Sequence, residues 1–244
     1  MHTSEAITGV GVTDLVFGVP LWLADTNCWV VRSASSSSEC VLIDVPPEPE
    51  KVAALLKERS LRVVAIIATH GHIDHIGGIP ALVERNENLD AHGRQVVPVH
   101  LHPADRHMMR DPVGNSGMLG QALVEAGLST REPEIVEDIS DGQIISGAGL
   151  RFRAIHTPGH TQGSTCFLAD VGDLPPLLFS GDHLFAGSIG RTDLPGGSME
   201  ALMHSMEAKI LPMSDVTVVL PGHGGTTTIG HERATNPFLR DIAS

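Results

Sequence analysis

Six consecutive residues, His70-Gly71-His72-Ile73-Asp74-His75, contain four side chains that can bind a metal ion. On a helix, residues two positions apart point in very different directions, so His70 and His72 could not share an ion there. Histidine is the commonest metal-binding side chain in proteins, and aspartate adds oxygen ligands. The spacing therefore predicts a metal-binding loop.

The segments on either side of this loop predict an α/β unit. Residues 61–69 form a short apolar run rich in β-branched side chains, which is typical of a buried strand. Residues 76–85 are expected to begin a helix. The cluster would then lie at the carboxyl end of a strand, where such folds usually place their chemistry.

Three more metal-capable side chains follow predicted strands in the same way. His160 follows residues 151–155, Asp182 follows residues 177–180, and His223 follows residues 216–220. Each lies beside a Gly or Pro-Gly turn, and glycine allows the backbone conformations and close approaches that such turns need. We therefore expect seven ligands to converge: His70, His72, Asp74, His75, His160, Asp182 and His223.

Five imidazoles and two carboxylates are more than a single four-coordinate site can use. They predict two divalent metal ions about 3.5–4 Å apart with a bridging group, as in binuclear hydrolases. Mixed nitrogen and oxygen ligation without thiolate suits Zn, our first choice, and Fe or Mn as alternatives. A purely structural site would be closed and would favour Cys ligands, so a catalytic centre is predicted.

Composition restricts the partners. The formal net charge is −13, aromatic residues make up 3% of the chain, and the Lys and Arg residues are not clustered, which argues against nucleic-acid binding. No window has the run of about 20 apolar residues that a membrane span requires, and the N-terminus does not resemble a signal peptide. Cys28, Cys40 and Cys166 form no CxxC pair, so reduced thiols and a cytoplasmic location are expected.

The remaining pattern predicts one domain over residues 1–244, without internal repeats. Strands are expected at residues 13–16, 27–32 and 40–44, and a helix at residues 51–58. Residues 111–120 are expected to be a loop, because they contain Asp-Pro and several glycines. A second sheet is expected from strands at residues 135–138, 143–145 and 150–155, and a later helix from residues 199–210.

The ordered motifs resemble those of the metallo-β-lactamase-fold hydrolases. After the opening cluster and Gly77-Gly78 come Thr157-Pro158-Gly159-His160-Thr161, Ser180-Gly181-Asp182 and Leu220-Pro221-Gly222-His223-Gly224. Residues 187–194 and 227–239 are most similar to the compact glyoxalase II-like (hydroxyacylglutathione hydrolase-like) branch. The resemblance covers nearly the whole chain.

This resemblance implies an α+β fold, an αββα four-layer sandwich with the metal ions in a cleft at one edge of the sheets. It also implies that His70, His72 and His160 hold one ion, that Asp74, His75 and His223 hold the other, and that Asp182 bridges them. Secreted β-lactamases of the zinc-cysteine type have Cys at the place of Asp182. Aspartate there, and the lack of a signal peptide, argue against antibiotic hydrolysis as the main role.

Two departures from the resemblance matter. Full-length glyoxalase II enzymes carry a carboxyl-terminal helical extension that helps to bind glutathione, and this sequence ends about 20 residues after His223. The hydrolytic centre is expected to carry over, while the glutathione preference stays open. Where the superfamily has Asp-Pro-Gly, this chain has Asp44-Val45-Pro46-Pro47, and Asp44 is expected to hold the ligand loop in place.

The predicted reaction is hydrolysis of a small-molecule hydroxyacyl thioester by a hydroxide that bridges the metal ions. Asp74 and Asp182 are the predicted catalytic residues, with Asp74 orienting the hydroxide and accepting its proton. A thiolate leaves readily near pH 8, so no strong acid is required. Arg191 is expected to contact a substrate carboxylate or else to pair with Asp193.

The closest alternative is a mononuclear iron persulfide (sulfur) dioxygenase, which the chain resembles at His70, His160 and Asp182. The intact Pro221-Gly222-His223-Gly224 favours two metal ions and therefore hydrolysis. A nuclease of this fold is disfavoured by the acidic charge. A non-enzymatic metal-binding module would leave its ligand set closed. His100, His102 and His107 surround a strand end and are further candidates for substrate contact.

Overall fold

Apolar, β-branched segments form two β-sheets in the computed structural model, which describes residues 10–240 and 242. The first sheet has seven strands in sequence order. They are β1 (Val10–Thr13), β2 (Val16–Leu21), β3 (Thr26–Val31), β4 (Glu39–Ile43), β5 (Arg62–Ile67), β6 (Val99–Leu101) and β7 (Val136–Asp138).

The second sheet has six strands in the order β15-β14-β11-β10-β9-β8, and a separate pair is formed by β12 and β13. Their bounds are β8 (Ile144–Gly147), β9 (Leu150–His156), β10 (Thr165–Ala169), β11 (Leu177–Gly181), β12 (Leu184–Phe185), β13 (Ser188–Ile189), β14 (Val218–Pro221) and β15 (Thr227–Thr228).

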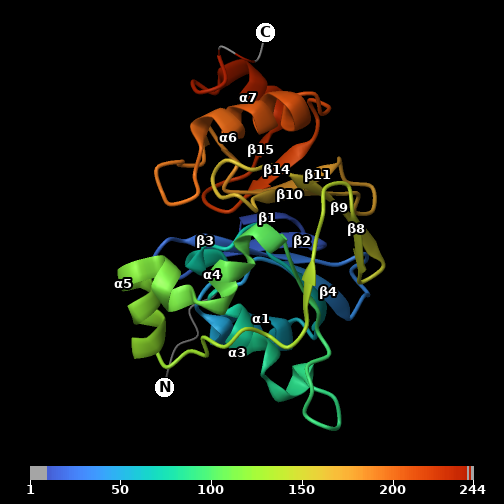
Figure 1. Cartoon of the computed structure of the whole chain (residues 1–244). Helices are drawn as coiled ribbons and strands as arrows, with labels where there is room; N and C mark the ends of the chain where they lie inside the picture. The colour runs from blue at the N-terminus through green and yellow to red at the C-terminus, as the bar shows by residue number, and fades with distance from the viewer. Residues whose placement is uncertain (1–9, 241, 243–244) are drawn as a thin grey trace, which may run out of the picture.

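Helices cover the outer face of each sheet (Figure 1). Apolar side chains of α1 and α3 pack on the first sheet, and those of α6, η3 and α7 pack on the second. The α-helices are α1 (Pro49–Glu58), α2 (Ile73–Ile76), α3 (Ile79–Val83), α4 (Arg106–Arg110), α5 (Pro112–Glu125), α6 (Met199–Ser205) and α7 (Ile229–Thr235). Short 3-10 turns, η1 (Asn86–Asn88) and η2 (Pro103–Asp105), and a π-helical turn, η3 (Met206–Ile210), complete the set.

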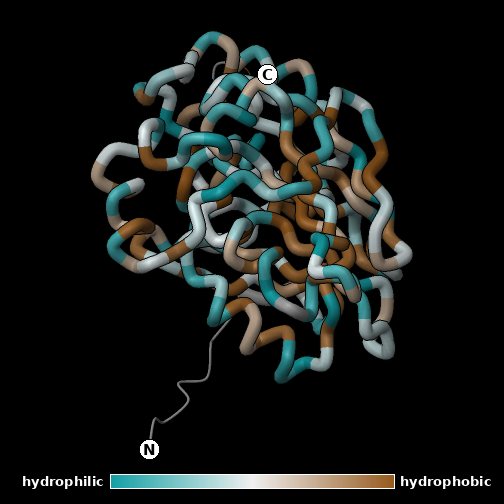
Figure 2. The backbone as a smooth tube through the Cα atoms, turned by 60° about the horizontal axis from the view of Figure 1, so that its bottom comes forward, coloured by the Kyte–Doolittle hydropathy of each residue, from teal (hydrophilic) through white to brown (hydrophobic). Residues whose placement is uncertain are grey.

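The core between the sheets follows from the two-residue period of the strands. In β3, Trp29 and Val31 face the second sheet, while Cys28 and Val30 face the helices of the first layer. Because both faces are covered, all six residues of β3 are buried. Apolar stretches accordingly gather at the centre of the molecule (Figure 2). The predicted αββα sandwich is confirmed.

Parallel pairing sets the position of the ligand loops. In the first sheet β4, β5 and β6 run parallel, and in the second sheet β11 and β14 do. The carboxyl ends of parallel strands meet at one edge of a sheet, so the loops that follow them lie together. The two edges are also joined directly, because Thr26 and His223 form a β-bridge.

The structure corrects several local expectations. The ligand hexapeptide is not a loop throughout, since α2 begins at Ile73 and carries Asp74 and His75. Of the expected loop at residues 111–120, residues 112–120 are helical. Pro112 begins α5, the Asp111 side chain accepts a hydrogen bond from the Gly114 backbone at the N-terminus, and Gly117 adopts a non-helical conformation (φ 52°) that bends the helix.

Two strand predictions were also wrong. Of residues 13–16, the middle two form the turn between β1 and β2, and β2 was missed because Gly18 and Pro20 interrupt its pattern. The strand expected at residues 135–138 lies in the first sheet, where β7 pairs parallel with β6. Within the residues that the structure describes, no helix has the length and apolar character of a membrane span.

Candidate metal centre

All seven predicted ligand side chains meet where the two sheets come together. His70, His72, Asp74 and His75 follow β5 of the first sheet, and the other three follow strands of the second sheet. Their ligand atoms fall into three groups, each with all members within 4.8 Å of one another. The groups are His70, His72 and His160; His70, His75 and Asp182; and Asp74, His75 and His223.

The first group consists of three imidazoles whose ring nitrogens face a common point. His72 Nδ1 lies 3.1 Å from His70 Nε2 and 2.8 Å from His160 Nε2. These three nitrogens come from loops after β5 and β9, so neither strand alone builds the group. An arrangement of three imidazoles could hold one divalent cation.

The group of Asp74, His75 and His223 combines a carboxylate with two imidazoles. Asp74 Oδ2 lies 3.4 Å from His75 Nε2 and 3.3 Å from His223 Nε2. Asp182 connects the groups, because its Oδ1 is 3.3 Å from His75 Nε2 while its Oδ2 is 3.5 Å from His160 Nε2. A carboxylate shared in this way can bridge two ions.

Buried polar atoms without hydrogen-bond partners show that this donor set fits a metal. His75 Nε2 and Asp182 Oδ1 are both buried and make no hydrogen bond among the described residues. Such atoms are rare in folded proteins, because each costs about 1–3 kcal/mol. Coordination would satisfy both, and imidazole with carboxylate suits Zn, Fe or Mn.

Asp44 orients two of the imidazoles from behind. His75 Nδ1 donates to Asp44 Oδ2 (2.8 Å), and the Thr69 hydroxyl donates to the same oxygen (2.8 Å). Because the Thr69 proton is engaged there, its oxygen accepts from His70 Nδ1 (3.1 Å). With Nδ1 engaged in this way, Nε2 is the ring nitrogen of both imidazoles that faces the centre. The structural role expected for Asp44 agrees with these contacts.

Backbone carbonyls orient two more imidazoles. His160 Nδ1 donates to the Arg191 carbonyl (2.7 Å), and His223 Nδ1 donates to the Ala24 carbonyl (3.0 Å). In both rings Nε2 is again left to face the centre. Arg191 therefore contributes its backbone to the centre, a role that the sequence did not predict.

Sequence reasoning missed Asp105, a fully buried carboxylate that joins the two ligand loops. Its Oδ2 accepts from the Gly71 backbone (2.9 Å) and the Thr161 hydroxyl (2.6 Å), and its Oδ1 accepts from the Gly163 backbone (2.8 Å). Asp105 follows β6 at the same sheet edge. The strand-end pattern that identified the ligands could therefore have found it.

Two glycines make room for the centre. A Cβ on Gly181 would lie 2.5 Å from Thr69 Oγ1, and the residue has φ +49°. A Cβ on Gly222 would lie 2.4 Å from Asp182 Oδ1. These close approaches explain the glycine in each strand-end turn.

Burial and neighbouring charges shift the pKa values of the converging side chains in different directions. The shifts favour neutral His72 and ionised Asp182, but protonated His223. Burial and the neighbouring His160 lower the pKa of His72 to about 4. Burial opposes charge on Asp182, yet His75 and His223 hold its pKa well below the ordinary value. Burial likewise opposes charge on His223, but hydrogen bonds to Asp182 and Asp74 raise its pKa to about 10.

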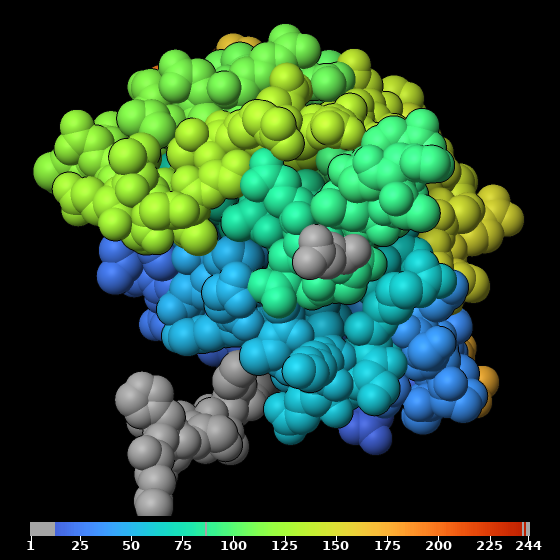
Figure 3. Space-filling model, turned by 90° about the horizontal axis from the view of Figure 1, so that it is seen from below, coloured from blue at the N-terminus to red at the C-terminus, as the bar shows by residue number. Residues whose placement is uncertain are grey.

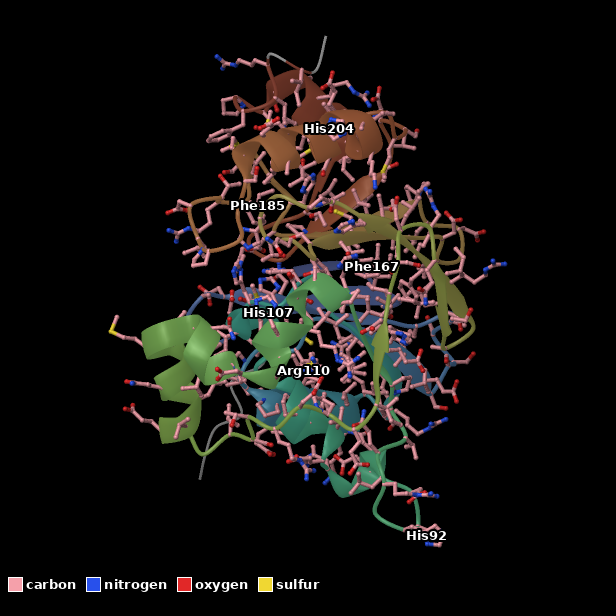
Figure 4. The ribbon with its side chains drawn as sticks, in the orientation of Figure 1. His92, His107, Arg110, Phe167, Phe185 and His204 are labelled. Atoms are coloured by element: carbon pink, nitrogen blue, oxygen red, sulfur yellow. The ribbon has the colours of Figure 1, made fainter. Side chains whose placement is uncertain are left out.

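A cavity of about 750 Å³ opens beside the ligands. Its lining includes Asp74, Asp182 and His107, whereas His100 and His102 are not part of it. Figure 4 shows His107 on α4, and the exposed His92 and His204 far from this region. The Arg191 side chain also lines the cavity, but it forms two 2.7 Å hydrogen bonds with the Asp193 carboxylate.

Several known proteins are similar to this chain in sequence and in fold. The chain is 30% identical to "Hydroxyacylglutathione hydrolase GloC" of Haemophilus influenzae, over 91% of this chain and 96% of that one. It is similar to the crystal structure of BLEG-1 B3 metallo-β-lactamase (34% identity, TM-score 0.77, covering 91% and 98% of the two chains). It is also similar to TTHA1623 in a di-iron-bound form (36% identity, TM-score 0.73, covering 92% and 100%).

The sequence model of the metallo-β-lactamase superfamily matches most of this chain. It spans residues 21–223, from the end of β2 to the last predicted ligand, and includes most strands of both sheets and all seven converging side chains. Members of this fold bind divalent metal ions, which agrees with the donor set described above. The chain belongs to the metallo-β-lactamase superfamily.

Proposed function

We propose that this protein is a binuclear metal-dependent thioesterase of the glyoxalase II type. Its substrate would be a hydroxyacyl thioester of a small thiol. His70, His72 and His160 would hold one divalent ion, Asp74, His75 and His223 the other, and Asp182 would bridge them. Zn is the proposed metal, with Fe or Mn as alternatives.

The position of Asp182 carries this proposal. Its two carboxylate oxygens face different imidazoles, 3.3 Å from His75 and 3.5 Å from His160, and one of the oxygens is buried without a hydrogen bond. A mononuclear site would not need a carboxylate shared between two imidazole groups. The similarity to a hydroxyacylglutathione hydrolase and to a di-iron protein supports the same conclusion.

When bound, two divalent ions would supply a water of lowered pKa and would polarise a carbonyl oxygen. The chain's own residues position the reaction. Asp74 lines the cavity, and the Thr26 hydroxyl donates to its Oδ2 (2.9 Å), which fixes the carboxylate for accepting a proton from the attacking water. The thiol leaves as thiolate, so the cavity needs no strong acid.

Metal analysis of protein purified from its own host, with a thioester panel on the same sample, tests the proposal. We expect about two ions per chain and turnover of thioesters. Asp182→Ala should lose metal and turnover together, whereas Asp173→Ala, in an exposed loop, should keep both. Full thioesterase activity in metal-free protein would overturn the mechanism.

Two further substrates belong in the panel. A β-lactam such as nitrocefin is included because a relative is described as a B3 metallo-β-lactamase. Glutathione persulfide with an oxygen electrode tests the dioxygenase alternative, in which His70, His160 and Asp182 hold a single Fe. Oxygen uptake with one Fe per chain and no thioester turnover would replace the hydrolase proposal.

A further inference from the structure

The walls of the cavity beside the metal centre are largely apolar. Trp22 and Leu23 come from the turn between β2 and β3, Met108 and Leu119 come from α4 and α5, and Leu194 comes from the loop before α6. Leu23 is 77% exposed and Leu119 is 44% exposed, so both present apolar surface that the fold itself does not cover. Figure 3 shows α5 in the green lobe that stands out from one side of the molecule.

The backbone at Trp22 is strained in a way that maintains this wall. Trp22 has φ +63°, a conformation that bulky side chains rarely adopt. Its backbone N–H donates to Glu48 Oε2 (2.8 Å), which holds the turn in place. Strain of this kind tends to persist at functional sites, where the surrounding structure over-determines it.

Apart from the proposed metal site, the walls of the cavity offer no unpaired Lys or Arg to an anionic substrate. Among the described residues that line it, Arg191 alone is a Lys or Arg, and its guanidinium donates through Nε and Nη2 to the Asp193 carboxylate. The carboxylate of Asp193 cancels the charge of this guanidinium. A substrate carboxylate placed against these walls would lose water without gaining an ion pair, which is costly.

We infer that the cavity accepts hydroxyacyl thioesters of an uncharged thiol in which the acyl chain is apolar apart from its hydroxyl, and that it discriminates against glutathione, a tripeptide with two carboxylates and one ammonium. This inference rests on the proposed thioesterase function and names its substrate class. The apolar walls supply the binding free energy, and the lack of an unpaired Lys or Arg along them supplies the discrimination.

Binding of two thioethers that cannot be hydrolysed tests the inference without turnover. S-hexyl-N-acetylcysteamine is neutral, and S-hexylglutathione carries the same alkyl group on an anionic carrier. Trp22 lines the cavity while Trp29 is 1% exposed in the core, so tryptophan fluorescence reports binding, and Trp22→Phe identifies the source of the signal. We expect the neutral thioether to bind about tenfold more tightly or better, because an unpaired carboxylate costs at least about this factor.

Adjacent residues of α5 provide a matched pair of variants. Leu119 lines the cavity, whereas Met118 is 87% exposed and does not line it. Leu119→Lys should tighten the binding of S-hexylglutathione several-fold and weaken that of the neutral thioether. Met118→Lys adds the same charge to the same helix and should change neither affinity by more than about twofold.

The outcomes separate this inference from the proposed function. Equal or tighter binding of S-hexylglutathione by the unsubstituted protein would overturn the inference, as would binding of neither thioether. The same holds if both lysine variants gain affinity alike, since a general charge effect would then explain the result. Preference for the neutral thioether without any thioester turnover would support the cavity assignment and contradict the thioesterase proposal.

Discussion

Replacing Asp105 with Asn should weaken the metal centre although Asp105 is not among its ligands. The two carboxylate oxygens accept from different backbone groups, Oδ2 from Gly71 and Oδ1 from Gly163. An amide keeps one accepting oxygen and places a donor where the other was. One buried N–H would then face another donor, which costs about 1–3 kcal/mol.

The loss should appear in both stability and metal affinity. Gly71 lies between His70 and His72, and Gly163 follows the loop of His160, so the variant loosens the loops of all three imidazoles of the first group. Losing an outer contact of this kind typically costs ten- to a hundredfold in metal affinity. Urea unfolding of the metal-free protein would measure the stability, and competition with a chromophoric chelator would measure zinc binding.

Asp138→Asn is the matched control. Asp138 is an exposed carboxylate that pairs with Arg106 at 3.0 Å, and exposed pairs of this type contribute about 0–1 kcal/mol. We expect stability and zinc affinity close to those of the unsubstituted protein. If Asp105→Asn behaved like this control in both measurements, the carboxylate would not be holding the ligand loops, and the reasoning would be refuted.

Three further predictions concern the turns, the protons and the thiols. In urea unfolding, Gly181→Ala should lower the free energy of unfolding by about 1–3 kcal/mol more than Gly187→Ala does. Both glycines have positive φ, but of the two only Gly181 lacks space for a Cβ. Equal losses in the two variants would contradict this reasoning. Zinc binding at pH 7.5 should release about two protons, because the raised pKa values of His75 and His223 keep both imidazoles protonated in the metal-free protein. Zinc affinity should therefore rise with pH. Calorimetry in buffers of different ionisation enthalpy would measure the proton release, and a release of no protons would refute the prediction. Burial raises the pKa of Cys166 to about 12, so above pH 9.0 the thiol ionises more readily in the unfolded chain than in the folded protein. The free energy of unfolding should therefore fall as pH rises above 9.0. Cys166→Ser should reduce this fall by up to about 1.4 kcal/mol per pH unit.

The sequence predicted the converging side chains because each one ends an apolar strand beside a glycine. That pattern is local, and parallel pairing brings such strand ends to one edge. The four layers came from the resemblance, and the structure confirmed them. The metal roles of the converging side chains stay predictions until metal is measured.

Other features depended on contacts that no local pattern contains. Asp105 is separated from Gly163 by 58 positions, and its importance lies in that long-range pair. The first part of α5, residues 112–120, was expected to be a loop because a proline and several glycines outweighed the capping contact of Asp111 in the pattern. Likewise β7 was placed in the wrong sheet, because its pairing with β6 spans more than 30 residues of intervening chain.

The division of the ligands between the sheets has a consequence for assembly. Every strand of the first sheet precedes residue 139, and every strand of the second follows residue 143, so each sheet comes from one contiguous half of the chain. The first half carries four of the converging side chains and the second carries three. Ions held between them would act as a reversible cross-link, adding RT ln(1 + [metal]/Kd) to the association of the halves. In a chain cut at the 139–143 connection, bound metal should therefore tighten the association of the two halves, and chelation should weaken it.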